Sequence, residues 1–96
     1  MLVEPAGPLN IGSVARLCAN FGVSELRLVA PRCDHLCEQA VQMAVHGQSL
    51  LNAAAVFPDL LTAINDCRRT VGSCGRLDHG EIPLQDPEQA LGWLLA

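Results

Sequence analysis

Two polar side chains stand on the side of a predicted helix that faces away from its apolar stripe. At 100° per residue, Arg16 and Asn20 lie within about 40° of each other and opposite that stripe. A guanidinium offers five donors in a fixed fork, which match the geometry of a phosphate. Arg16 is therefore either an ordinary solvated helix residue or part of a site or subunit contact on the helix's second face. The apolar stripe is formed by Ile11, Val14, Ala15 and Cys18.

Further polar residues follow the strands that the sequence predicts. In open α/β sheets, ligands bind outside the carboxyl ends of the strands. Asn10 is predicted to cap the helix, whose first turn offers free amides and the positive end of the dipole. One rim of the sheet is therefore expected to gather Glu4, Asn10, Arg32 and Arg76.

A turn of small residues precedes Arg76. Ser73, Cys74 and Gly75 come directly after Gly72, at the expected end of a third strand. Such a turn lets a ligand approach the backbone closely. It fits equally well with a plain transition from strand to loop.

The five cysteines do not predict a metal site. Cys33, His35 and Cys37 are close in sequence, but the chain has none of the paired Cys-x-x-Cys knuckles that indicate zinc. An odd number of cysteines also fits a closed disulfide framework poorly. We therefore expect reduced, packed cysteines and no metal.

The elements that position these residues alternate between strands and helices. Strands are predicted at 2–3, 26–29 and 69–74, and the first helix runs from residue 10 to Gly22. Later helices are predicted at 38–45, from Pro58 through Ile64, and from Pro87 to Leu95 with Asp86 as cap; residues 49–55 are expected to be helical or irregular, and 76–85 a loop. This order is typical of an α/β domain with a parallel sheet and helical crossovers.

Composition narrows the possible functions. The 96 residues carry a net charge of −4, and all six basic residues are Arg. An acidic chain argues against a stand-alone nucleic-acid binder but leaves room for a local Arg cluster. No apolar run approaches the ~20 residues that span a bilayer, and the first residues lack the pattern of a signal peptide. A cytoplasmic protein without membrane contact is expected.

Three segments of the chain together resemble one enzyme family. EPAGPLNIGSVARLCANFGVSELRLVAPR is similar to the first motif region of the SPOUT superfamily of RNA methyltransferases. The similarity is closest to the TrmH/SpoU branch and its TrmJ-like tRNA 2′-O-methyltransferases. QAVQMAVHGQSLL and AINDCRRTVGSCGR match the family in order and spacing. The resemblance covers essentially the whole chain.

The resemblance implies transfer of a methyl group from S-adenosylmethionine to a ribose 2′-hydroxyl of RNA, with tRNA as the expected partner. Asn10 and Arg16 match the family's motif Asn and catalytic Arg. Ser73, Cys74 and Gly75 fall where the family has a Thr-Ser-Ala turn that contacts the methyl donor. RNA contacts are expected from Arg16, Arg32 and Arg76. The first helix lies at a homodimer interface in this family.

The resemblance also implies a partial domain. Residues 1–76 carry the motifs, and 77–96 look like a connector loop and helix. The family's knotted second half, which supplies most of the donor pocket, has no counterpart after Arg76. We therefore expect the N-terminal half of a methyltransferase domain, inactive by itself. The alternative is a non-enzymatic remnant of this fold that binds RNA or a protein.

Overall fold

The computed structural model describes residues 1–73 and 85–96. The chain divides into two compact units, Met1–Asn65 and Asp66–Ala96, and each is described by itself. Cys74, Gly75 and Arg76 lie outside the described residues.

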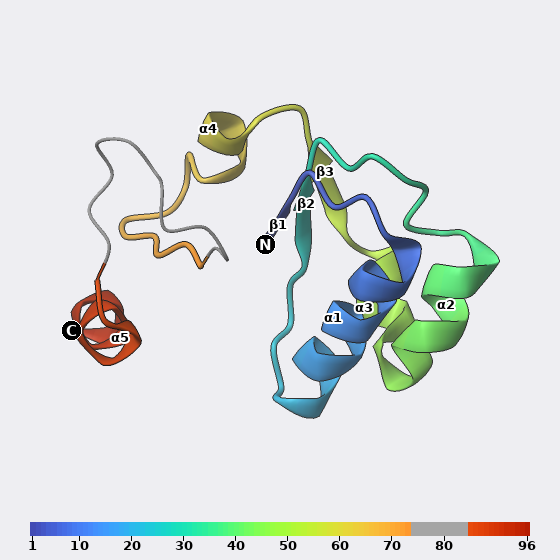
Figure 1. Ribbon diagram of the computed structural model, residues 1–96, viewed down its shortest axis with the longest axis horizontal. Coiled ribbons are helices and arrows are strands. Elements are labelled where there is room, and N and C mark those ends of the chain that lie inside the picture. Colours follow the sequence, from blue (N-terminus) through green and yellow to red (C-terminus); the bar gives the residue numbers. More distant parts are fainter. Residues whose placement is uncertain (74–84) are drawn as a thin grey trace. The chain divides into compact units, whose positions relative to one another are not determined.

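The first unit is built on a parallel sheet. Its strands are β1 (Leu2–Val3), β2 (Arg27–Val29) and β3 (Ala55–Phe57), in the spatial order β1-β2-β3. Leu2 pairs with Leu28, and Leu28 with Val56. All three strands end on the same side of the unit (Figure 1). The predicted parallel sheet with helical crossovers is therefore confirmed.

The helices lie between and after these strands. They are α1 (Pro8–Asn20), α2 (Glu38–Ala44), the 3-10 helix η1 (Val45–Gly47), α3 (Gln48–Asn52), α4 (Leu60–Ala63) and α5 (Pro87–Leu95). The predicted helices at 38–45 and 87–95 are confirmed within a residue. The predicted helix from Pro58 is shorter, because Asp59 caps it and Ile64 ends it.

The prediction that Asn10 caps the first helix is wrong. Gly7 is the N-cap, Pro8 is the first helical residue, and Asn10 lies inside the first turn. The fixed φ of proline suits this first position, and its missing N–H would have had no helical partner there.

The predicted third strand is also wrong for residues 69–73, which form neither strand nor helix. The third strand is β3, which pairs with β2 along its whole length. Val56 and Phe57 have the β-branched and aromatic side chains that strands favour. The expectation of helical or irregular structure at 49–55 is confirmed over α3 but is wrong at Ala55, which begins β3.

The core lies between the sheet and the helices α1, α2 and α3. Its buried residues come from both layers, with smaller side chains on α2 than on the strands: Ile11, Ala15, Leu26, Leu28, Ala40, Ala44 and Leu51. α1 packs mainly against α2. The predicted apolar stripe of the first helix is confirmed at Ile11 and Ala15, with Val14 packed against the cluster.

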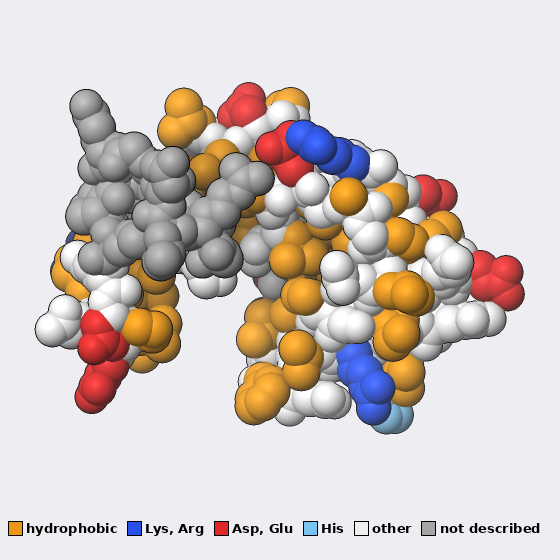
Figure 2. All heavy atoms as spheres, viewed as in Figure 1, with side chains coloured by type: hydrophobic (Ala, Val, Ile, Leu, Met, Phe, Trp, Pro, Cys, Tyr) orange, Lys and Arg blue, Asp and Glu red, His pale blue; other side chains and the backbone are white. Residues whose placement is uncertain are grey.

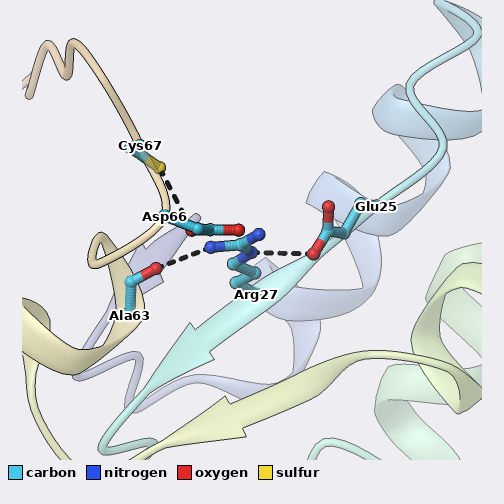
Figure 3. A network of polar contacts seen from close by, with 5 residues as sticks. All are labelled: Glu25, Arg27, Ala63, Asp66 and Cys67. Carbon is cyan, nitrogen blue, oxygen red and sulfur yellow. Dashed lines mark hydrogen bonds and ion pairs between the residues drawn. The ribbon is translucent and has the colours of Figure 1, made fainter.

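The opposite face of the sheet is partly covered by α4, which lies beside β2 and β3. Arg27 reaches this face from β2, and several contacts hold its guanidinium. It pairs with Glu25 at 2.7 Å, donates to the Ala63 carbonyl at 2.7 Å, and lies 5.7 Å from the centre of the Phe57 ring. Figure 3 shows the guanidinium between the Glu25 carboxylate and the end of α4.

The second unit contains α5. The Asp86 side chain accepts a hydrogen bond from the Glu88 amide at 2.8 Å, so the predicted cap is confirmed. Arg69 lies 5.2 Å from the centre of the Trp93 ring and donates to the Trp93 carbonyl. None of the helices within the described ranges is long and apolar enough to cross a membrane.

Candidate functional site

Arg16 lies on the face of α1 that points away from the core. Ile11 and Ala15 on the opposite face are fully buried, whereas Arg16 and Asn20 are exposed. The Arg16 guanidinium has no hydrogen bond or ion pair with any residue that the structure describes. No residue in the described part of the chain uses its five N–H donors, so these donors are available to a ligand.

The backbone beneath Arg16 is tightly held. A Cβ on Gly47 would lie 2.3 Å from the Ala15 carbonyl oxygen and 2.8 Å from the Arg16 nitrogen, so η1 approaches α1 backbone to backbone. Val45, just before this contact, has a φ of 49°, which a β-branched residue rarely adopts. The structure thus fixes the base of Arg16 and leaves its side chain free.

Asn10 is exposed in the first turn of α1, and its side chain lies near Gly7. Arg16 is six positions further along α1, which places the two about 9 Å apart along the helix axis and about 120° apart around it. The two motif positions therefore lie on different sides of α1.

Glu4 and Arg32 meet at the carboxyl ends of β1 and β2, as the rim prediction required. Arg32 Nη2 lies 2.8 Å from Glu4 Oε1. The Arg32 amide donates to the Pro5 carbonyl at 2.9 Å, and Cys33 Sγ lies 3.8 Å from the same oxygen. The segments that leave β1 and β2 thus run side by side (Figure 1). Arg76, the fourth predicted member of the rim, lies outside the described residues.

The same backbone step follows both strands. Glu4 and Ala30 have positive φ angles of 49° and 43°. The Glu4 amide donates to the Val29 carbonyl, and the Ala30 amide to the Phe57 carbonyl, each at 2.7 Å. Each strand therefore extends its ladder by one bond before the chain turns away from the sheet.

Ser73 is exposed and belongs to the second unit, in a segment without helix or strand. Cys74 and Gly75, the other two predicted donor contacts, lie outside the described residues. A hollow of about 420 Å³ in the second unit is lined by Cys67, Arg68, Arg69, Leu94 and Ala96. It does not suit S-adenosylmethionine, because the positively charged sulfonium would meet two guanidinium groups.

Cys18, Cys33 and Cys37 are half-buried free thiols. Cys67 is a free thiol that is exposed, so the expectation of packed cysteines is wrong there. Across residues 1–73 and 85–96, no group of three or more His, Cys, Asp or Glu side chains could hold a metal ion.

Sequence reasoning missed two polar residues that organise the first unit. Arg27 interrupts the apolar run from Leu26 to Val29, and a charge inside a predicted buried strand was the available signal. Asp59 stands directly before Leu60, and Thr62 follows three residues later; an Asp at this place is a common helix cap.

The first unit is an α/β domain with a parallel sheet. It has an exposed Arg on its first helix and an ion pair that joins the segments after β1 and β2. Residues 1–90 match the model of the SpoU rRNA Methylase family, so the chain belongs to that family.

Curated relatives and a solved structure agree with this assignment. The chain is 36% identical to the tRNA (cytidine/uridine/adenosine-2′-O-)-methyltransferase TrmJ of Pseudomonas aeruginosa, over 93% of the chain and 34% of the relative. It is 35% identical to the tRNA (cytidine-2′-O-)-methyltransferase TrmJ of Methanocaldococcus jannaschii, over 78% of the chain and 32% of that protein. The crystal structure of TrmJ from Z. mobilis ZM4 superposes with a TM-score of 0.84 at 36% identity, covering 98% of this chain and 42% of that one. The chain thus spans about a third of the length of these two curated relatives.

Proposed function

We propose that this chain forms the N-terminal part of an RNA ribose 2′-O-methyltransferase that uses S-adenosylmethionine and acts on tRNA. One observation carries the proposal. Arg16 is exposed on a backbone held by Gly47 and has no partner among the described residues. By the resemblance alone, it matches the family's catalytic Arg. The relative named tRNA (cytidine/uridine/adenosine-2′-O-)-methyltransferase TrmJ aligns with 93% of the chain, a share that includes Arg16.

In this proposal, Arg16 stabilises the negative charge that develops on the ribose 2′-oxygen or holds the adjacent phosphate. A guanidinium stays protonated at neutral pH, so it donates hydrogen bonds but does not accept the hydroxyl proton. Donors placed where charge develops in the transition state are among the largest contributions to catalysis. Another acceptor must take the proton.

Arg32 is proposed as an RNA contact beside Arg16, and Asn10 as a second residue of the catalytic motif. Both Asn10 and Arg32 are exposed, and Arg32 stands on the rim formed by the segments after β1 and β2. Arg76 is proposed as a further RNA contact. A line of separate contacts suits an RNA backbone, whose phosphates recur along the strand.

The hollow lined by Cys67, Arg68, Arg69, Leu94 and Ala96 does not fit the methyl donor. We assign the donor contact to Ser73, Cys74 and Gly75 together with further residues, and derive no step through the donor. When bound, S-adenosylmethionine supplies the methyl group.

The exposed face of α1 is proposed as a homodimer interface. Beside Arg16 and Asn20, α1 carries two exposed apolar side chains, Leu9 and Leu17, and the exposed Phe21 follows it as the C-cap. In Figure 2, hydrophobic side chains are spread among polar ones over the part of the surface where α1 lies. Large exposed apolar side chains that lie together often mark a protein interface. We also propose that the protein is located in the cytoplasm.

Methyl transfer tests this function. The full-length protein is incubated with an unmodified tRNA transcript and S-adenosylmethionine labelled in the methyl group, and the RNA is digested to nucleosides. The proposal predicts label in a 2′-O-methylated nucleoside. RNA binding without any methyl transfer would favour the binding remnant instead, and label on a base would exclude ribose methylation.

A further inference from the structure

The Glu4 carboxylate forms an ion pair with Arg32, the arginine on the rim that is proposed to contact RNA. We propose that Glu4 holds Arg32 in the place of a phosphate, and that an RNA phosphate displaces the Glu4 carboxylate when the substrate binds. Glu4 is then a specificity-determining residue, because it blocks Arg32 against ligands that do not bring a phosphate to this point. The inference rests on the proposed RNA substrate.

The side-chain pair is close but easily exchanged. Nη2 and Oε1 are 2.8 Å apart, while the side chains of Arg32 and Glu4 remain 66% and 52% exposed. Ion pairs with this exposure contribute little to stability and are screened by salt. A phosphate offers the same guanidinium a second charge-assisted hydrogen bond in bidentate geometry. The exchange therefore replaces a weak partner with a stronger one.

The backbone keeps both residues in place when the side chains separate. The Glu4 amide is bonded to the Val29 carbonyl at 2.7 Å and the Arg32 amide to the Pro5 carbonyl at 2.9 Å. These main-chain bonds join the two segments without help from the ion pair. The Arg32 guanidinium is thus presented from a fixed position, which lowers the cost of ordering it around a ligand.

The charge balance explains the use of a carboxylate here. An acidic chain, with a net charge of −4, has few cations with which to attract RNA. Because the Glu4 carboxylate neutralises its charge, Arg32 does not add to the long-range attraction of RNA of any sequence. It contributes when a phosphate comes within hydrogen-bonding distance, so its contribution depends on correct placement of the RNA.

The test is a double-mutant cycle on RNA binding by the full-length protein, with an unmodified tRNA transcript as probe at several salt concentrations. The variants are Glu4→Gln, Arg32→Gln and their combination. Glu38→Gln is the matched control, because Glu38 is an exposed carboxylate on α2 bonded only to Gln42 in the described part of the chain.

Glu4→Gln is expected to tighten binding about two- to fivefold, the range of a surface ion pair. Arg32→Gln is expected to weaken binding and to lower the slope of log affinity against log salt by about one. In the Arg32→Gln background, Glu4→Gln should lose at least half of its effect. Arg32→Lys keeps the charge and should retain part of the salt dependence, even if Arg32→Gln proves too unstable to purify.

The following results would overturn the inference. If Glu4→Gln tightens binding equally with and without Arg32, or no more than Glu38→Gln, the carboxylate acts only through net charge. A wild-type protein that binds no tRNA would end the proposed function and this inference together. Wild-type binding with an additive cycle would end the inference alone.

Discussion

Arg27 illustrates how a single charged residue can join two elements. It lies in a three-residue strand between Leu26 and Leu28, both buried, and its own side chain is 17% exposed. A charge in this position costs free energy unless it is paired and hydrogen-bonded. Its bond to the Ala63 carbonyl connects β2 to the end of α4. Arg27 therefore fixes α4 on the sheet as well as satisfying its own charge.

Replacing Arg27 with Met keeps much of the side-chain volume and removes the donors. The free energy of unfolding should fall by about 1–3 kcal/mol, because the Ala63 carbonyl loses a charge-assisted partner. Urea denaturation measures the change. Glu25→Gln is the control and should cost less than about 1 kcal/mol, since the Glu25 side chain is 62% exposed. Equal effects of the two variants would contradict this role of Arg27.

Asp59 gives the first unit an acid-sensitive cap. The backbone amide and the hydroxyl of Thr62 both donate to its carboxylate at 2.8 Å. These hydrogen bonds lower the pKa of Asp59 below its ordinary value of 3.8. Because the folded pKa is the lower one, the stabilisation is fully present above the unfolded pKa and is lost as pH falls through the folded pKa.

Asp59→Asn should therefore flatten the acid limb of the stability curve and leave its shape near neutral pH unchanged. Thermal unfolding measured from pH 7 down to the acid limb checks this. Asp34→Asn, at an exposed loop carboxylate, is the control. An unchanged acid limb in Asp59→Asn would show that the Thr62 bonds do not govern this titration.

At the scale of the elements, two glycines set how closely α1 is packed. A Cβ on Gly12 would lie 2.4 Å from the Ala40 carbonyl oxygen and 2.8 Å from Met43 Cβ. Gly47 makes the corresponding approach from η1 to the backbone at Ala15 and Arg16. The absence of side chains at these points lets α2 and η1 contact the α1 backbone, and so determines the position of Arg16.

Gly12→Ala should lower the free energy of unfolding by about 1–3 kcal/mol, because the new methyl group has no space against backbone atoms. Gly92→Ala is the matched control, since Gly92 lies within α5 with nothing within 4 Å of its Cβ position. There the substitution should add about 0.5–1 kcal/mol through helix propensity. Denaturation of both variants measures the contrast; destabilisation by Gly92→Ala or stabilisation by Gly12→Ala would contradict the packing account.

Helical elements were predictable where their apolar period is long. The stripe of α1 and the Asp-Pro start of α5 both appear directly in the sequence. β3 was not predictable in the same way, because three alanines precede Val56 and local preference does not distinguish helix from strand there. Its identity depends on pairing with β2, which is a long-range contact.

The candidate site was predictable only in part. Helical spacing places Arg16 on the outer face of α1, and strand order brings Glu4 to Arg32. Placing Arg76 on the same rim depended on a strand at 69–74, and residues 69–73 do not form one. The close approach at Gly47 needs the tertiary fold, since no periodicity indicates which glycine faces another backbone.

At the scale of the whole molecule, the proposed homodimer depends on the exposed side of α1. Leu17 is 53% exposed and Phe21 80% exposed, so neither contributes much to the packing of the first unit. Burying such side chains against a second copy would be favourable, at roughly 25 cal/mol per Å² of apolar surface. The same interface would bring Arg16 close to the partner subunit.

Leu17→Asp is expected to convert the full-length protein from dimer to monomer, because an unpaired carboxylate would be buried in the interface. Sedimentation velocity measures the change. Leu61→Asp is the control, because Leu61 on α4 is 79% exposed and lies away from α1. A wild-type protein that sediments as a monomer would contradict this interface, as would identical behaviour of the two variants.

The central claim is that Arg16 serves ribose methylation, and one rate comparison tests it most directly. Single-turnover transfer of labelled methyl to a tRNA transcript is measured for wild type, Arg16→Ala and Arg68→Ala, an exposed arginine outside α1. Removing a charge-stabilising donor should slow Arg16→Ala by about 10²–10³-fold, with an unchanged melting temperature, while Arg68→Ala stays close to wild type. An Arg16→Ala protein that folds normally and methylates the ribose at the wild-type rate would contradict the account.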